Sequence, residues 1–189
     1  MSKIEIRDII ISVLVLSFAF SKFYGFALSL FISSFVFVLH ELGHRFTARH
    51  FGAFAEYRMW TFGLLLCLLM AIIPGGFIFA APGAVYYTTS VRRGFAWDVH
   101  RLTQKEIGLI SLSGPAINIA LGFAFAAAAI FVPAISWLVG PASYIAFFLA
   151  LFNLLPLGPL DGRTIFTWNR PVWAATMLLA GIGYFLVGI

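Results

Sequence analysis

The longest uncharged stretch of the sequence covers residues 107–160, where 54 consecutive positions contain no Asp, Glu, Lys or Arg. A helix needs about 20 apolar residues to cross the hydrocarbon core of a bilayer, so this stretch is too long for one crossing and about right for two. Pro133 and the Gly-Pro pair at 140–141 mark the turn, which predicts helices at 107–132 and 142–160. A chain that contains such a stretch does not fold as a water-soluble globule.

Three other apolar segments have the length of a helix. Residues 26–44 would form about 28 Å of helix, and residues 172–189 are just long enough to cross. Residues 9–21 can cross only if Lys22 extends its ammonium group toward the lipid headgroups; a signal peptide is the alternative, although no small-residue cleavage site follows. With 62% hydrophobic and 10% charged residues, the sequence predicts an all-α polytopic membrane protein with about five transmembrane helices, organised as one domain over residues 1–189.

The segment at 61–90 lies between the second and third predicted helices and carries no charge. Pro and Gly residues at 74–76 and 82–83 interrupt it, and residues 84–89 have the composition of a strand. If the segment crosses the membrane, the twelve Lys and Arg residues divide 5:7 between the two sides; if it dips in and returns, eleven lie on one side and only Lys22 on the other. The positive-inside rule therefore favours a re-entrant or β-like segment.

The net charge of +5 could indicate a nucleic-acid partner in a soluble protein. Here the basic residues lie at the ends of apolar segments, where membrane topology and anionic lipid headgroups explain them better. We therefore expect the lipid bilayer, and no nucleic acid, as a partner.

The second predicted helix ends with the motif HELGH at residues 40–44. Residues i and i+4 of a helix lie on one face, so the imidazoles of His40 and His44 can reach one Zn²⁺ while Glu41 lies beside a water molecule as general base. The five-residue pattern also occurs by chance. Two histidines and a glutamate are costly to hold in a bilayer, however, and ionisable residues there are usually functional. The motif therefore predicts a metal site within the membrane.

A catalytic zinc site usually takes three protein ligands, and Asp161 is the strongest candidate for the third. The other acidic residues lie in polar termini or loops, whereas Asp161 follows the fourth predicted helix directly. If the segment after the second helix is re-entrant, two crossings separate His44 from Asp161, and both lie on the same side at a similar depth. His50 and His100 neighbour arginines in loops and are weaker candidates.

Two asparagines, Asn118 and Asn153, lie within the apolar third and fourth helices. Each could make a hydrogen bond between helices, or could orient the substrate or a developing oxyanion. Pro156 and Pro159 would loosen the fourth helix just before Asp161 and turn its carboxylate inward. Both interpretations of the asparagines stay open.

Three motifs in this order resemble the site-2 protease family of intramembrane zinc metalloproteases. They are HELGH at 40–44, GPAIN at 114–118, and the run from asparagine to Asp-Gly at 153–162, and the resemblance covers residues 26–162. The resemblance implies an intramembrane protease that hydrolyses peptide bonds within or near the transmembrane segments of membrane-anchored proteins. It also implies that the basic side is the cytosol and that the active site opens toward it.

The same resemblance implies roles for particular residues. It implies one zinc ion per chain, held by His40, His44 and Asp161, with Glu41 as the catalytic base. Asn118 and Asn153 would lie near the site.

The chain also departs from many members of this family. The loop at 88–106 offers 19 residues, too few for a peptide-binding PDZ module, so substrate selection would rest on the membrane core or on a separate partner. Only one predicted span follows Asp161, which puts a gate built from two later helices in doubt. The strand-like residues 84–89 could pair with an unwound substrate, or could be a plain interfacial loop with two tyrosines.

A second hypothesis comes from a different class of protein, a membrane metal carrier or a metal-dependent binding protein without catalysis. Carriers commonly show internal repeats, and none is visible here. A carrier also has no need for Glu41 between the two histidines. An inactive protease retained as a binding protein is a third option, although all the predicted ligands and the base are present.

Overall fold

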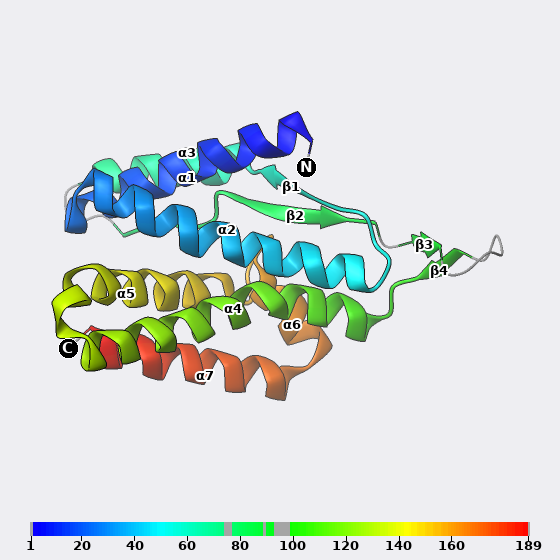
Figure 1. Cartoon of the computed structure of the whole chain (residues 1–189). Helices are drawn as coiled ribbons and strands as arrows, with labels where there is room; N and C mark the ends of the chain where they lie inside the picture. Colours follow the sequence, from blue (N-terminus) through cyan, green and yellow to red (C-terminus); the bar gives the residue numbers. More distant parts are fainter. Residues whose placement is uncertain (1, 74–76, 89, 93–98, 189) are drawn as a thin grey trace.

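The computed structural model describes residues 2–73, 77–88, 90–92 and 99–188, and it is mostly helical. Two layers of helices lie against each other, with α1, α2 and α3 in one layer and α4, α5, α6 and α7 in the other (Figure 1). The helices are α1 (Lys3–Tyr24), α2 (Phe26–His50), α3 (Thr61–Ile72), α4 (Gln104–Phe131), α5 (Ser136–Asn153), α6 (Asp161–Trp168) and α7 (Arg170–Val187). The structure is that of an all-α polytopic membrane protein, as the apolar pattern predicts.

Among the described residues, four stretches of helix are long and apolar enough to cross a membrane, namely α2, α4, α7 and the stretch Pro133–Asn153, which joins a short 3₁₀ turn to α5. A helix also occupies the position of the first predicted crossing. α1 extends to Lys3, however, and its first two turns carry Glu5, Arg7 and Asp8. These charges set α1 apart from the four apolar stretches.

The fourth predicted helix differs from the observed one at both ends. Pro141 lies inside α5 rather than in the turn before it, and the helix starts at Ser136. α5 ends at Asn153, well before residue 160, because Pro156 and Pro159 lack the N–H that would continue the helical hydrogen bonds. The irregular stretch that follows leads directly into α6, whose first residue is Asp161.

A two-stranded antiparallel sheet joins the chain before α3 to the chain after it. β1 (Ala55–Met59) pairs with β2 (Gly83–Tyr87), so that Met59 lies opposite Gly83 and Ala55 opposite Tyr87. α3 is 12 residues long, about 18 Å, which is too short to cross. Since the chain leaves from β1 and returns to β2, the segment is re-entrant. Residues 74–76 and 89 of this predicted segment lie outside the described residues.

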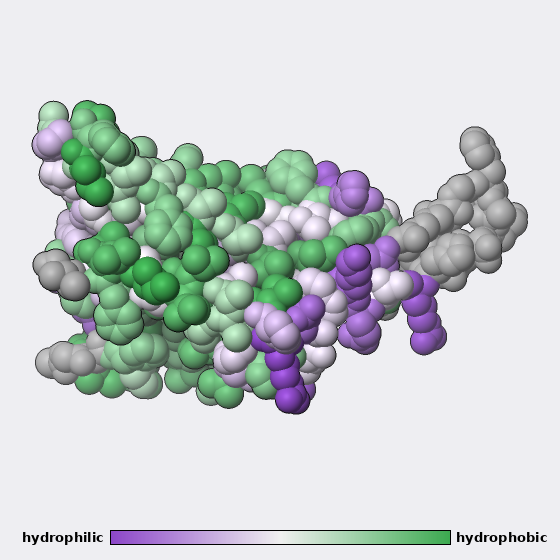
Figure 2. Space-filling model, turned by 90° about the horizontal axis from the view of Figure 1, so that it is seen from below, coloured by the Kyte–Doolittle hydropathy of each residue, from purple (hydrophilic) through white to green (hydrophobic). Residues whose placement is uncertain are grey.

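A second hairpin, β3 (Ser90–Arg92) and β4 (Val99–Arg101), extends beyond the helices (Figure 1). On the face that Figure 2 shows, apolar side chains cover most of the helical body, and polar side chains gather at the end from which this hairpin extends. α2 ends and α4 begins at the same end. This distribution is typical of a membrane-embedded body with one strongly polar end.

Candidate metal centre

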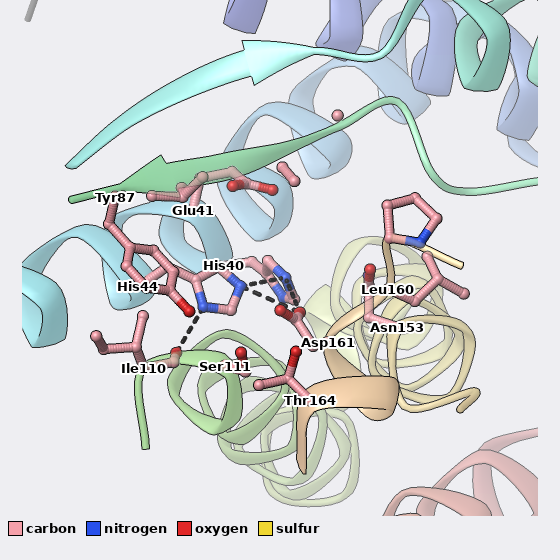
Figure 3. Close-up of a pocket in the computed structure, with 14 residues that line it drawn as sticks. His40, Glu41, His44, Tyr87, Ile110, Ser111, Asn153, Leu160, Asp161 and Thr164 are labelled. Atoms are coloured by element: carbon pink, nitrogen blue, oxygen red, sulfur yellow. Dashed lines mark hydrogen bonds and ion pairs between the residues drawn. The ribbon is translucent and has the colours of Figure 1, made fainter. Parts of the chain in front are cut away.

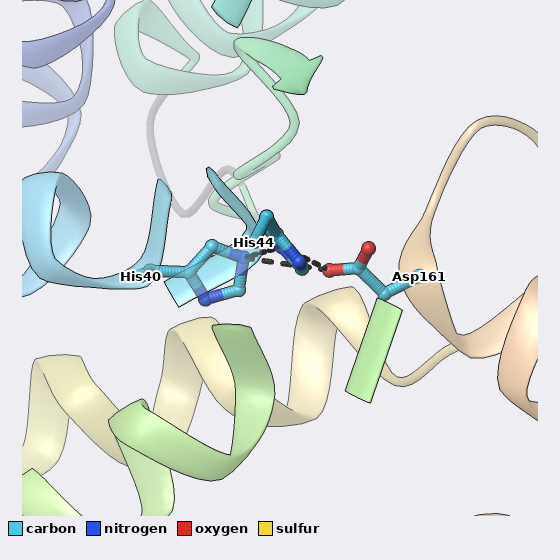
Figure 4. Close-up of side chains that lie close together, drawn as sticks. All are labelled: His40, His44 and Asp161. Carbon is cyan, nitrogen blue, oxygen red and sulfur yellow. Dashed lines mark hydrogen bonds and ion pairs between the residues drawn. The ribbon is translucent and has the colours of Figure 1, made fainter. Parts of the chain in front are cut away.

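Three potential ligand atoms meet between the two layers. His44 Nε2 lies 3.1 Å from His40 Nε2 and 3.1 Å from Asp161 Oδ2, and His40 Nε2 lies 3.4 Å from Asp161 Oδ2. The histidines come from adjacent turns of α2, and Asp161 approaches from the start of α6 (Figure 4). Within the described part of the chain, these are the three His, Cys, Asp or Glu side chains that could hold a metal ion together.

The spacing of these atoms fits a zinc ion. Nitrogen and oxygen ligands lie about 2.0–2.1 Å from tetrahedral Zn²⁺, which places neighbouring ligand atoms about 3.3 Å apart. The three observed separations, 3.1, 3.1 and 3.4 Å, match this value. Two histidines and one carboxylate also leave the fourth position open, as catalytic zinc sites require.

α4 orients both imidazoles through their second nitrogen atoms. His44 Nδ1 lies 2.7 Å from the carbonyl oxygen of Ile110 and donates its hydrogen there, which leaves Nε2 free to bind a metal. The side-chain amide of Asn118 lies 3.1 Å from His40 Nδ1, and Asn118 Oδ1 has no partner among the described residues. With the amide turned over, Oδ1 would accept a hydrogen bond from His40 Nδ1, which would leave Nε2 free to bind a metal.

Gly114 allows α4 to approach the two histidines closely. A Cβ atom at this position would overlap His44 Nε2 and would lie 2.7 Å from His40 Nε2. Gly43 plays the matching role on α2, since a Cβ there would lie 2.5 Å from Ile117 Cδ1. Without side chains at these two positions, α2 and α4 can pack closely enough to keep the imidazoles in place.

Asp161 owes its position to the irregular stretch before α6. A Cβ at Gly162 would overlap the carbonyl group of Leu154, so the start of α6 packs directly on that backbone. Trp173 Nε1 donates to the same carbonyl at 2.7 Å. Burial acts to raise the pKa of Asp161, but His44 and His40 outweigh it and lower the pKa to about 2.

Glu41 points into the pocket next to the ligand atoms, beneath β2 (Figure 3). Its side chain is buried, and its Oε2 atom has no hydrogen-bond partner among the described residues. A buried polar atom without a partner is costly and calls for a ligand or a water molecule at that place. The position beside the ligand triangle is the one that a general base needs.

The pocket around these groups has a volume of about 180 Å³. β2 forms one wall, and the stretch before α6 forms another (Figure 3). Asn153 lines this pocket and donates from Nδ2 to the carbonyl oxygen of Leu149 at 2.9 Å. Asn118 does not line it, because its fully buried side chain lies behind His40. The two asparagines therefore occupy different kinds of position.

The remaining histidines are not brought to the site by any described contact. His50 is exposed at the end of α2, with its ring 5.3 Å from the ring of Phe51. The side chain of His100 lies outside the described residues.

Three further groups at the site have no sequence motif of their own. Tyr87 and Ser111 line the pocket, and the Ile110 carbonyl accepts the hydrogen bond from His44. Ser111 precedes the GPAIN motif at 114–118 by one helical turn, which is the one sequence signal that could have pointed to it. A backbone carbonyl gives no such signal.

The hydrogen bonds of the sheet determine which backbone groups of β2 face the pocket. Thr88 N donates to Phe54 O at 2.9 Å, and Trp60 N donates to Pro82 O at 2.8 Å. Bonded pairs alternate along antiparallel strands, so the even-numbered residues of β2 bond to β1. The N–H and C=O groups of Gly83, Val85 and Tyr87 point away from β1, and all three residues line the pocket. One edge of the sheet is thus open beside the ligand atoms.

One comparison with known proteins reveals a clear relative. A protein of Methanocaldococcus jannaschii named "Putative zinc metalloprotease" is 39% identical to this chain over 193 residues, which cover 98% of the chain and 94% of the relative. No family model matches the chain. No solved structure matches it either.

Proposed function

The chain belongs to the zinc metalloproteases, and we propose that it cleaves peptide bonds within or next to the transmembrane segments of membrane-anchored proteins, as site-2 proteases do. The position of the ligand triangle carries this proposal. His40 and His44 lie on α2, which is long and apolar enough to cross a membrane, and Asp161 follows α5, which is another such helix. Hydrolysis at this site would take place at membrane depth or at its border.

The chemistry follows from the residues around the pocket. His40, His44 and Asp161 would hold one zinc ion per chain, which supplies a Lewis acid that polarises the scissile carbonyl and lowers the pKa of water. The Glu41 carboxylate takes a proton from the attacking water molecule and passes it to the leaving nitrogen. The two products are a new carboxyl terminus and a new amino terminus.

The open edge of β2 supports a protein substrate. A transmembrane helix hides its carbonyl groups in hydrogen bonds four residues apart along the chain, so it must unwind locally before attack. An extended segment added beside β2 would replace those bonds with bonds to Gly83, Val85 and Tyr87. In this proposal the pairing with β2 places a peptide bond next to Glu41.

The two asparagines take different parts in this proposal. Asn118 contacts His40 and no pocket space, so it positions a metal ligand. Asn153 lines the pocket, where its side-chain amide can orient the substrate or the oxyanion.

The distribution of basic residues supports a cytosolic opening of the site. Arg49, Arg101, Lys105 and Arg163 lie near the ends of helices at the same end of the molecule as the metal centre. The positive-inside rule assigns that end to the cytosol. Water would then reach the pocket from the cytosolic side.

The most informative experiment uses the purified protein and a single-span test substrate, with and without a zinc chelator. We expect cleavage by the wild-type protein, loss of cleavage with the chelator, and recovery when zinc is added back. The Glu41→Gln variant should bind zinc and fail to cleave, because the amide cannot accept the proton. Retained cleavage by this variant would refute the role of Glu41. Zinc uptake into vesicles by a wild-type protein that does not cleave would favour the metal carrier instead.

A further inference from the structure

The two edges of the β1–β2 sheet differ in their surroundings, since one faces the pocket and the other faces α1. The alternation that directs Gly83, Val85 and Tyr87 toward the pocket also directs the N–H groups of Tyr57 and Met59 away from β2, toward α1. An unpaired edge on this side would offer a second place where an extended peptide could add.

Two carboxylates of α1 occupy this outer edge. Glu5 Oε1 accepts a hydrogen bond from Tyr57 N, and Asp8 Oδ2 accepts one from Met59 N, each at 3.3 Å. Glu5 and Asp8 are only 2% and 3% exposed. Two carboxylates that are three residues apart on α1 thus accept hydrogen bonds from two N–H groups that are two residues apart on β1. The first two turns of α1 therefore lie where a third strand would lie.

One of these carboxylates also reaches the helix that carries the metal ligands. Arg45, the residue after His44, donates from Nη1 to Glu5 Oε1 at 2.5 Å, and both side chains are buried. Burying two charges costs desolvation, and such a pair often contributes little to stability compared with apolar residues. The pair does, however, join α1, β1 and α2 at one oxygen atom.

We infer that Glu5 and Asp8 are positioning residues for proteolysis, which close the outer edge of the sheet and hold its open edge beside α2. The inference rests on the proposed function, because it concerns how the substrate-binding strand is held. An extended substrate then adds to the sheet at β2, next to the ligand atoms. The distance between β2 and the histidines is set through Glu5 and Arg45.

Asp8 offers the sharper test, because its ion-pair partner Arg7 is largely exposed and tolerates the loss of charge. Asp8→Asn keeps a side-chain oxygen that can accept from Met59 N, whereas Asp8→Ala removes it. We expect Asp8→Ala to raise KM for a single-span substrate about tenfold, with kcat within about threefold of wild type, because substrate pairing weakens while the chemistry is intact. Asp8→Asn should restore KM, and zinc content should be unchanged in both variants.

Glu56→Gln serves as the matched control, because it removes a carboxylate of β1 that bonds Ser2 and Arg58 and accepts no backbone N–H from the described residues. Its KM should equal that of the wild type. Equal KM values for Asp8→Ala and the wild type would overturn the inference. So would an equal rise in Asp8→Asn and Asp8→Ala, because the effect would then come from the charge and not from the hydrogen bond to β1.

A measurement on the wild-type protein decides the inference even if Asp8→Ala does not fold. Amide hydrogen exchange should be slow at Tyr57 and Met59, whose N–H groups are bonded to α1, and faster at Val85, whose N–H group faces the pocket. Equal exchange at all three amides would overturn the inference. A wild-type protein that cleaves no substrate would refute the proposed function, and the exchange pattern would still report whether the outer edge is closed.

Discussion

At the scale of single residues, Gly114 is the residue outside the ligand set on which the geometry of the metal centre depends most. Gly114→Ala would place a methyl group against both imidazoles and push α4 from α2. We expect zinc affinity to fall by at least about tenfold, as it does when other residues that contact and orient metal ligands are replaced. Gly140→Ala is the control, since nothing lies within 4 Å of its Cβ position. Competition with a fluorescent zinc chelator measures both, and equal affinities would contradict the role of Gly114.

The two asparagines should respond differently to replacement. Asn118→Ala removes the partner of His40 Nδ1 and should weaken zinc binding about tenfold. Asn153→Ala should leave zinc affinity unchanged and lower the cleavage rate, because Asn153 lines the pocket and contacts no ligand. Zinc affinity and cleavage of the test substrate, measured on the same preparations, check this split. The reverse pattern would show that the roles are exchanged.

Some of these residues could be predicted from the sequence and others could not. The spacing alone places His40 and His44 on one face of a helix, with Glu41 beside them. The basic residues indicate an even number of crossings between His44 and Asp161, which predicts that both lie on the same side of the membrane. Gly114 could not be assigned a role in this way, since a glycine in an apolar helix looks the same whether it packs against lipid or against an imidazole. The pairing of Glu5 with Arg45 joins residues 40 positions apart and leaves no periodic signal.

At the scale of secondary structure, β2 gives the most direct test of substrate pairing. Val85→Pro removes the N–H group that faces the pocket, while the bonds to β1 from the even-numbered residues remain. We expect cleavage of a single-span substrate to fall by at least about tenfold, with zinc still bound. Val85→Ala keeps the N–H group and serves as control. Equal activity of the two variants would contradict pairing at this edge.

The elements were predictable to different degrees. The long apolar helices follow from the absence of charge, and α5 ends early where prolines remove backbone donors. The strand composition after residue 83 indicated β2, but β1 with its sequence AEYRM carries two charges in five residues and was not predicted. Strands that pair across a re-entrant helix depend on tertiary contacts that local composition does not report.

At the scale of the whole molecule, the proposed orientation can be tested by labelling in intact cells. Cys67 is the only cysteine and is fully buried, so an introduced surface cysteine is the main site of reaction. Lys22→Cys and Arg49→Cys lie at opposite ends of the membrane-embedded body. With a membrane-impermeant maleimide we expect Lys22→Cys to react in intact cells, and Arg49→Cys only after permeabilisation. The opposite result would place the metal centre on the outer side.

The overall arrangement depends on bringing Asp161 to two histidines that lie more than a hundred residues earlier in the chain. The zinc content of the purified Asp161→Ala variant, measured by elemental analysis beside the wild type, tests this arrangement most directly. We expect one zinc per chain in the wild type and almost none in the variant, because His40 and His44 alone form an incomplete site. A folded Asp161→Ala protein that retains a full equivalent of zinc would contradict it.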